Sequence, residues 1–385
     1  MRCILRTILV LLAATSFALA ADPPRARDLG IPFDGTPGPW NAITDVAGVT
    51  VGHRTLIEDL TDGRAVRTGV TAVLPRGTES LMRPVFAGWF ALNGNGEMTG
   101  TTWVEESGQL EGPVMLTNTH SVGVVRDATI AWRIRKAGPD ATGYYWSLPV
   151  VAETWDGHLN DINGFHVAAA DVGAALDGAA SGPIAEGNVG GGTGMVCYEL
   201  KCGIGTTSRV VEILGSSFTV GVLVQANYGL RDELVIAGVP VGRALPDHRV
   251  YSQPEPPPPG DGSIIVVLAT DAPLLPHQLE RVARRAALGL ARNGSIAHNG
   301  SGDIFIAFST ADQSLGRADR VLTHQSIPND ELDSLFAATV QATEEAIVNA
   351  MVAARDMVGD QGRYAKALPH TKLHELLAAA GRTAP

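Results

Sequence analysis

The sequence predicts an α+β protein built as a layered sandwich, and three observations lead to this fold class. Segments with strand-like and helix-like spacing of apolar residues are mixed along the chain without a strict strand–helix–strand rhythm, which disfavours a doubly wound sheet. Two nearly continuous apolar runs, at 218–226 and 263–269, are typical of strands buried on both faces. Of the 385 residues, 45% are hydrophobic and 18% are charged, which excludes a disordered chain.

The individual elements follow from the spacing of apolar residues along the chain. Alternation of polar and apolar residues predicts strands, and a repeat of three to four residues predicts helices. Asn329 and Asp330 form a capping signal before the last helix, in which Thr343 is the one polar gap in the apolar stripe. The expected elements are strands at 41–53 and 69–74, a helix at 121–136, strands at 218–226 and 263–269, and helices at 274–292 and 331–355.

Size and charge limit the classes of function. A chain of this length forms one large domain or two of ordinary size. It carries 29 basic and 40 acidic side chains, a formal net charge of −11, and it has no basic run. Because nucleic-acid binding needs a concentrated Lys/Arg face, we predict no nucleic-acid partner.

The first 20 residues have the pattern of a secretory signal. Arg2 and Arg6 precede an apolar run at 8–12, and Ala18-Leu19-Ala20 supplies small residues for cleavage. We therefore predict an exported protein, periplasmic or secreted, that has no membrane segment after the signal is removed. The alternative is an anchor that stays, but the apolar run is far shorter than the ~20 residues of a spanning helix.

The cysteines and histidines give no metal pattern. Cys3 leaves with the signal, and Cys197 and Cys202 are expected either to pair in an oxidising compartment or to remain two buried thiols. The ten histidines are scattered, and only His370 and His374 are spaced to share a helix face, without a third ligand in view. We predict neither a metal nor another cofactor.

A stiff, Pro-rich stretch at 251–260 resembles a linker between domains, yet it leads directly into the apolar run that begins at Ser263. A serine at the start of a buried strand, preceded by a glycine, is suited to attack on the carbonyl before it. Gly262 has no Cβ to obstruct that attack, and it tolerates strained backbone angles. Cleavage there would expose a serine hydroxyl beside a free α-amine, which is a nucleophile with its own base. A Gly-Ser pair in an ordinary turn is the alternative.

Several segments in order give this chain a family resemblance over nearly its whole mature length. The chain resembles the autoproteolytic serine aminopeptidases, the group that contains L-aminopeptidase/D-amino-acid esterase-amidases and β-peptidyl aminopeptidases. The segments that carry the resemblance are NAITDV (41–46), VGH (51–53), GNGEMTG (94–100), LTNTHSVG (116–123), EGNVGGGTGM (186–195), GIGTTSR (203–209), QANYG (225–229), GDGSIIVV (260–267) and GSGDIFIAFS (300–309).

The resemblance implies a catalytic centre at the Gly262–Ser263 junction. Ser263 would be the nucleophile for self-cleavage and for turnover, so that one catalytic domain, 21–385, matures into an α chain, 21–262, and a β chain, 263–385. Asn227 would donate to the oxyanion. Ser301 and Asp303, two apart on one strand, would face the same side, with Asp303 holding the Ser263 ammonium and Ser301 orienting the proton.

The resemblance also implies how substrate is held. Glu153 would receive the free amine of the substrate, and Asn118 would line the site at the start of a helix. Family members often carry a tyrosine where this sequence has Trp155, and an indole donates from a different position, so the role of Trp155 stays open. Taken without the resemblance, Glu153 is a solvated acid, Asn227 satisfies a turn, and 299–303 is a polar turn.

The implied fold is a four-layer α/β/β/α sandwich resembling N-terminal-nucleophile hydrolases, assembled as homo-oligomers of four or more. The implied substrates are short peptides, aminoacyl amides or esters, and the choice among L-α, D-α and β-amino acids is open. One alternative is an acyltransferase of the ornithine acetyltransferase type, although its nucleophile is threonine. The other is an exported solute-binding protein whose Pro-rich stretch is a hinge.

Overall fold

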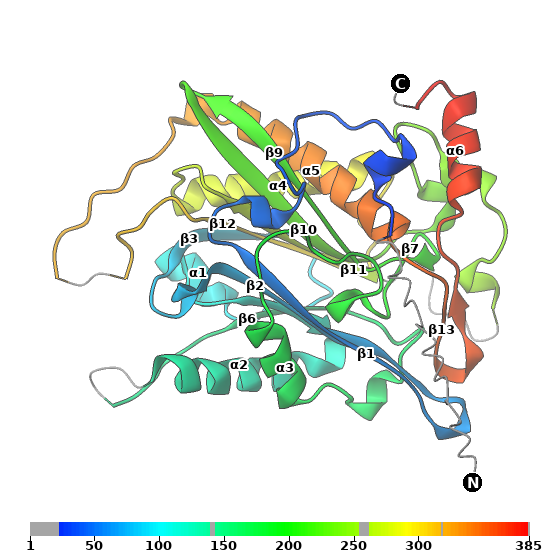
Figure 1. Cartoon of the computed structure of the whole chain (residues 1–385), viewed down its shortest axis with the longest axis horizontal. Helices are drawn as coiled ribbons and strands as arrows, with labels where there is room; N and C mark the ends of the chain where they lie inside the picture. The colour runs from blue at the N-terminus through cyan, green and yellow to red at the C-terminus, as the bar shows by residue number, and fades with distance from the viewer. Residues whose placement is uncertain (1–22, 139–142, 254–261, 317–318, 384–385) are drawn as a thin grey trace, which may run out of the picture.

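Two β-sheets stacked face to face form the centre of the molecule, and helices cover both outer faces (Figure 1). The structure is a computed structural model that describes residues 23–138, 143–253, 262–316 and 319–383. The predicted signal at 1–20 and residues 254–260 of the Pro-rich stretch lie outside the described residues. The layer order is α/β/β/α, so the predicted α+β sandwich is confirmed.

The larger sheet has the strand order β4-β3-β12-β11-β10-β9, in which only the β11–β12 pair is parallel. The predicted strands at 218–226 and 263–269 lie inside β10 and β11, so both are confirmed. The six strands are β3 (Val85–Ala91), β4 (Gln109–Leu110), β9 (Ile204–Ile213), β10 (Ser216–Asn227), β11 (Gly262–Thr270) and β12 (Ser301–Ser309).

The smaller sheet has the order β1-β2-β5-β6, with β5 and β6 parallel. The predicted strand at 69–74 lies inside β2, but the prediction at 41–53 is half wrong, because the strand begins at Thr50. Ile43, Val46 and Val49 are spaced by three, and they reach the core from a 3-10 turn at Ile43–Asp45 and the bend after it. The strands are β1 (Thr50–Asp59), β2 (Ala65–Thr78), β5 (Val114–Asn118) and β6 (Val150–Thr154).

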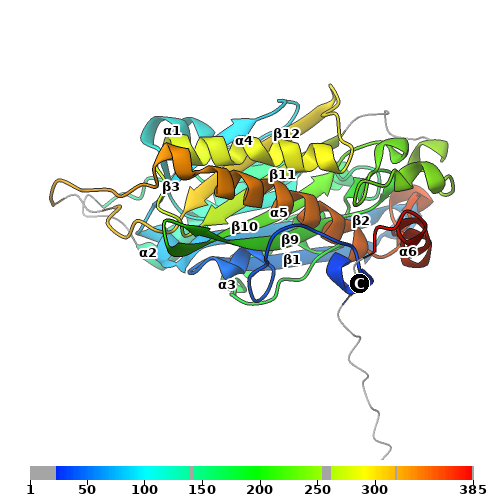
Figure 2. The ribbon, with the colours of Figure 1, turned by 90° about the horizontal axis from the view of Figure 1, so that it is seen from above.

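Helices α4 and α5 cover the larger sheet, as Figure 2 shows from above, and α2 and α3 cover the smaller one. The three predicted helices are confirmed as α2, α4 and α5, although α5 is shorter than the predicted 331–355. Within the described part of the chain, no helix is both long enough and apolar enough to cross a bilayer. The helices are α1 (Thr101–Ser107), α2 (Val122–Ala137), α3 (Ala169–Asp177), α4 (Pro276–Arg292), α5 (Asp333–Val352) and α6 (His370–Ala379).

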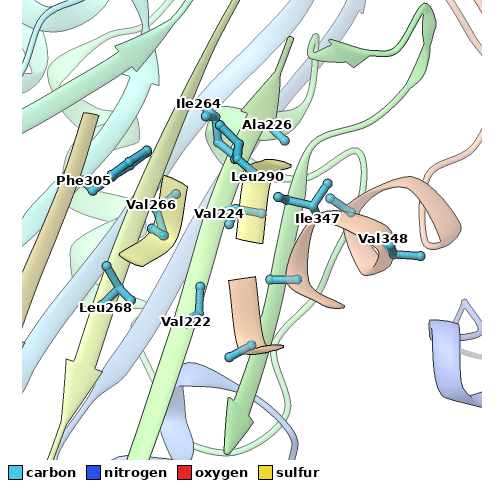
Figure 3. Packing of buried hydrophobic residues seen from close by; sticks show 14 of the residues in the cluster. Val222, Val224, Ala226, Ile264, Val266, Leu268, Leu290, Phe305, Ile347 and Val348 are labelled. Carbon is cyan, nitrogen blue, oxygen red and sulfur yellow. The ribbon is translucent and has the colours of Figure 1, made fainter. Parts of the chain in front are cut away.

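Burial on both faces explains why the central strands are continuously apolar. Val224 and Val266 point toward α4 and α5, where Leu290 and Ile347 meet them (Figure 3). The intervening residues, such as Ile265, belong to a second core between the two sheets. Each strand of this kind therefore holds its position by side chains on two sides.

A short hairpin beside the larger sheet carries the two remaining cysteines. Its strands are β7 (Val196–Cys197) and β8 (Leu200–Lys201), and Cys197 is disulfide-bonded to Cys202 with 5.4 Å between their Cα atoms. The two cysteines are therefore paired, a choice that their spacing in the sequence had left open. A second short ladder joins β13 (Met357–Val358) to β14 (Tyr364–Ala365).

Close contact between β9 and α5 gives a test of this packing. A Cβ on Gly205 would lie 1.9 Å from the carbonyl oxygen of Ala346, so Gly205→Ala must push helix and strand apart. We expect it to lower the free energy of unfolding by about 1–3 kcal/mol in a denaturant titration. The matched control is Gly173→Ala in α3, where a Cβ meets open space and helix propensity favours alanine. Equal stability of the two variants would contradict the packing described.

Candidate active site

Three neighbouring strand ends meet at Ser263. In the larger sheet, Ser263 of β11 is directly opposite Asn227 of β10 on one side and Gly302 of β12 on the other. Residues opposite each other project from the same face, and this face looks toward the smaller sheet, as Ile265 does two residues later. The register thus brings the predicted nucleophile and the predicted oxyanion donor together.

The hydroxyl of Ser263 lies against the peptide bond that precedes it. Its Oγ donates to the carbonyl oxygen of Gly262 at 2.6 Å and accepts from the backbone N–H of Gly302 at 3.3 Å. Only 4% of the residue is exposed. An oxygen held beside a carbonyl in a nearly dry setting is a nucleophile poised at the predicted cleavage point.

Gly262 is required at its position by lack of space. A Cβ there would lie 2.5 Å from the carbonyl oxygen of Asn227 and 2.7 Å from the Cα of Tyr228. Its φ lies outside the positive region, so lack of space for a Cβ, and not a strained backbone, accounts for glycine here. The glycine serves the close approach of β11 to the end of β10, which keeps the Gly262–Ser263 peptide bond beside Asn227.

Asn227 is the last residue of β10, and a hydrogen bond fixes the orientation of its side-chain amide. Its Oδ1 accepts the backbone N–H of Val196 at 2.9 Å, and the residue is 6% exposed. Since an N–H can bond only to the amide oxygen, the Nδ2 group is turned away from Val196. An amide N–H₂ on the face that carries Ser263 is the group an oxyanion needs, and Asn227 lines a small cavity beside Trp155 and Val196.

Ser301 and Asp303 do share one face of β12, as predicted, and their side chains are bonded to each other. Ser301 Oγ donates to Asp303 Oδ1 at 2.7 Å, and both residues are buried. The register pairs them with Gly262 and Ile264, so they lie on the face opposite the Ser263 side chain. They flank the backbone of the junction, and not the Ser263 hydroxyl.

Asp303 is a buried carboxyl with unused hydrogen-bonding capacity. It is 1% exposed, and its Oδ2 has no hydrogen-bond partner among the described residues. Burial raises the pKa of Asp303 to about 6, and the bond from Ser301 opposes that rise. A carboxyl in this state is ready to pair with a positive charge.

Glu153 lies at the end of β6 in the smaller sheet and is 3% exposed. Its Oε1 accepts the backbone N–H of Glu97 at 3.0 Å, and its Oε2 accepts the hydroxyl of Thr119. Burial raises the pKa of Glu153, while these two hydrogen bonds oppose the rise. The carboxyl is therefore not the solvated acid of the alternative interpretation.

A cavity of about 210 Å³ connects the two sheets at this point. It brings together the predicted nucleophile, the predicted amine acceptor and the predicted aromatic residue. Trp155 is 37% exposed and forms part of its wall. The described residues that line the cavity are Asn95, Thr119, Glu153, Trp155, Gly262, Ser263 and Gly300.

Asn118 is not among the residues that line this cavity. Its Nδ2 donates to both carboxylate oxygens of Asp156, at 3.0 and 3.2 Å, and the neighbouring Thr119 reaches the cavity in its place. Burial raises the pKa of Asp156 to about 6, and the hydrogen bonds from Asn118 and Asn160 oppose the rise.

Sequence reasoning missed Asn95, Thr119 and Asp156. Asn95 and Thr119 fall within the family segments at 94–100 and 116–123, so those motifs were the available signal. The loop at Gly96 crosses β12 so closely that a Cβ on Gly302 would lie 2.5 Å from the carbonyl oxygen of Asn95. Asp156 lies in the segment 150–157 that contains Glu153, but only the folded chain brings it to Asn118.

A scan against protein families matches residues 41–365 to peptidase family S58. Two relatives are β-peptidyl aminopeptidases BapA. That of Sphingosinicella microcystinivorans is 56% identical over 94% of this chain and 93% of its own. That of Sphingosinicella xenopeptidilytica is 49% identical over 98% of this chain and 96% of its own.

Two solved structures are similar over nearly all of the chain. The L-aminopeptidase D-Ala-esterase/amidase of Ochrobactrum anthropi, a prototype of the serine aminopeptidases with a variant of the Ntn-hydrolase fold, is 52% identical. It matches with a TM-score of 0.88, over 94% of this chain and 100% of that one. A β-aminopeptidase of Burkholderia sp. is 48% identical, with a TM-score of 0.84 over 93% and 99%. The chain therefore belongs to peptidase family S58 and is a serine aminopeptidase with an N-terminal-nucleophile hydrolase fold.

Proposed function

We propose that this chain cleaves itself between Gly262 and Ser263 and then removes N-terminal residues from short peptides, aminoacyl amides or esters through an acyl-enzyme on Ser263. The observation that carries this proposal is the cavity shared by Ser263 and Glu153. One wall supplies a nucleophile and the other a carboxyl for a free amine. The relatives named as β-peptidyl aminopeptidases and as a D-Ala-esterase/amidase make β- and D-aminoacyl amides part of the substrate panel to be tested.

Maturation begins with the hydroxyl that contacts Gly262. Ser263 Oγ adds to the Gly262 carbonyl carbon, the peptide C–N bond breaks, and the nitrogen takes up a proton. The resulting ester is hydrolysed by water, which leaves a carboxylate on Gly262 and a free α-amine on Ser263. The enzyme would then consist of 21–262 and 263–385 as two chains of one domain.

Asp303 supplies an electrostatic reason for this cleavage. In the uncleaved chain its carboxyl is buried with one oxygen that has no hydrogen-bond partner among the described residues, close in register to the nitrogen of Ser263. Cleavage converts that peptide nitrogen into an amine that can carry a positive charge, with an ordinary pKa of about 8. Pairing then stabilises the ionised carboxylate, and Ser301 holds it in place.

Turnover uses the same groups on an external carbonyl. The substrate ammonium pairs with Glu153, which restricts attack to the N-terminal residue. Ser263 Oγ attacks the carbonyl carbon and its proton passes to the α-amine, while Asn227 Nδ2 donates to the developing oxyanion. The leaving amine takes the proton, and water then releases the acyl group from Ser263.

Export and assembly belong to the proposal as well. The leader pattern at 1–20 predicts secretion or a periplasmic location, and the Cys197–Cys202 disulfide supports an oxidising compartment. Homo-oligomers of four or more chains are proposed from the family resemblance. Light scattering of the purified protein measures that assembly directly.

Ser263→Ala tests the nucleophile. The variant lacks the hydroxyl that contacts the Gly262 carbonyl, so it should remain a single chain without amidase activity. Denaturing electrophoresis and N-terminal sequencing should find two chains in the wild type, the smaller beginning Ser-Ile-Ile-Val. Two chains or aminoacyl amide hydrolysis in Ser263→Ala would show that another residue is the nucleophile.

Glu153→Gln tests amine recognition. Loss of one charge-assisted hydrogen bond should lower kcat/KM on free-amine p-nitroanilides by about 10- to 100-fold, largely through KM. Glu106→Gln in α1 removes the same charge from an exposed side chain and serves as the control. If both variants keep wild-type kcat/KM, Glu153 does not receive the amine.

Asp303 predicts a pH effect on the stability of the uncleaved Ser263→Ala chain. A carboxyl whose folded pKa is raised to about 6 favours folding at low pH and loses that contribution as the pH rises through about 6. Adding Asp303→Asn should therefore stabilise the uncleaved chain more at pH 7.5 than at pH 5, by roughly 1.4 kcal/mol, because the folded pKa lies about one unit above pH 5. Unfolding titrations at both pH values measure this difference, and a pH-independent difference would refute the assignment.

A further inference from the structure

The hairpin of β7 and β8 is the element that orients Asn227. Its Val196 N–H holds Asn227 Oδ1 at 2.9 Å, and nothing else among the described residues donates to that oxygen. The direction of the Asn227 amide therefore depends on where one peptide unit, between Met195 and Val196, is held. That unit lies outside the larger sheet, so the strand register does not position it.

The other end of the same peptide unit is bound by a lysine. Lys201 Nζ donates to the carbonyl oxygen of Met195 at 2.8 Å, and Lys201 is the cross-strand partner of Val196 in the hairpin. The ammonium, the Met195–Val196 peptide and the Asn227 amide thus form one line of hydrogen bonds. The line ends at the Asn227 Nδ2 group on the face of Ser263.

Lys201 is buried completely without a counter-charge. Its exposed fraction is 0%, and no carboxylate among the described residues lies within ion-pair distance of it. Besides Met195, its Nζ approaches the carbonyl oxygens of Cys202 at 2.6 Å and Gly192 at 3.5 Å. Burial lowers the pKa of Lys201 well below its usual range. Three carbonyl acceptors match the three donors of an ammonium, and these contacts favour the charged form.

Burying such a charge is costly, and other bonds also restrain the shape of the hairpin. The disulfide between Cys197 and Cys202 already closes the hairpin. The backbone N–H of Cys202 also donates to the Met195 carbonyl oxygen at 3.1 Å. A buried cation at a place where other bonds already hold the local structure points to a use of its charge.

We propose that Lys201 is a positioning residue that orients and polarises the Asn227 amide through the Met195–Val196 peptide. A cation on the peptide oxygen strengthens the N–H of Val196 as a donor, and the bond from Val196 in turn strengthens the Nδ2 donors of Asn227. These stronger donors stabilise the negatively charged oxyanion of the transition state more than the neutral carbonyl oxygen of the bound substrate. This inference rests on the proposed role of Asn227 as the oxyanion donor.

The test compares Lys201→Met, which removes the charge at similar length, with Lys201→Arg, which keeps it. Each is expressed as the full chain, checked for self-cleavage by electrophoresis, and assayed on an aminoacyl p-nitroanilide. A sulfonyl fluoride that modifies serine nucleophiles counts the active sites, so that kcat refers to correctly formed enzyme. The control is Arg133→Met, which removes a cation that is 3% exposed and donates to the Glu111 carbonyl oxygen in another layer.

We expect kcat per active site to fall about tenfold in Lys201→Met, with KM within twofold of wild type. The expected loss is smaller than the roughly 100-fold or greater loss that follows removal of a whole oxyanion donor, because Asn227 itself remains. Lys201→Arg should retain most of kcat, and Arg133→Met should keep kcat per site whatever its stability.

Unchanged kcat in Lys201→Met, or a change confined to KM, would overturn the proposal. An equal loss of kcat in Lys201→Arg would also overturn it. If both Lys201 variants are insoluble or unprocessed beside a processed wild type, Lys201 is a folding residue and the proposal is rejected. A wild type that is uncleaved and inactive would instead refute the proposed function itself.

Discussion

The register of β10, β11 and β12 is the constraint on which the rest of the site depends. It sets Asn227, Ser263 and Gly302 in one row, and it puts Asp303 one residue farther along on the opposite face. Apolar residues on both faces of these strands hold the register, because a slip by one residue would exchange the cores on the two sides of the sheet. The nucleophile is therefore positioned by two hydrophobic cores and not by a loop.

The smaller sheet completes the site because the ends of its strands lie close to the strand ends of the larger sheet. Glu153 and Thr119 come from the ends of β6 and β5, and the loop around Gly96 bridges them to Gly302 in β12. Glycines at these crossings let backbones approach where any side chain would collide. The many glycines of the chain thus include several that join the halves of the site.

The three charged groups around the junction are buried in different ways. Glu153 has two hydrogen bonds and faces a cavity that can admit an ammonium. In the part of the chain that the structure describes, Asp303 keeps one oxygen without a hydrogen-bond partner, and Lys201 Nζ donates to carbonyl oxygens alone. None of these carries an ion pair among the described residues. Such burial lowers stability. It has a function if the opposite charge is supplied later: by the substrate ammonium for Glu153, by the new α-amine for Asp303, and by the oxyanion of the transition state for Lys201.

Much of this protein followed from the sequence by itself. Apolar runs predicted β10 and β11, and helical spacing predicted α2, α4 and α5. The ordered motifs identified the family and candidate site residues such as Ser263 and Glu153. Both kinds of signal are available because periodicity and local motifs are properties of the chain. Tertiary structure alone decided that Asn118 bonds to Asp156 and that Thr119, in its place, lines the cavity. It also decided that Ser301 and Asp303 lie on the face opposite the Ser263 side chain. Only the folded chain brings Lys201 to the peptide that is bonded to Asn227. These contacts join residues from separate strands and loops, and only strand register and close backbone packing set their distances.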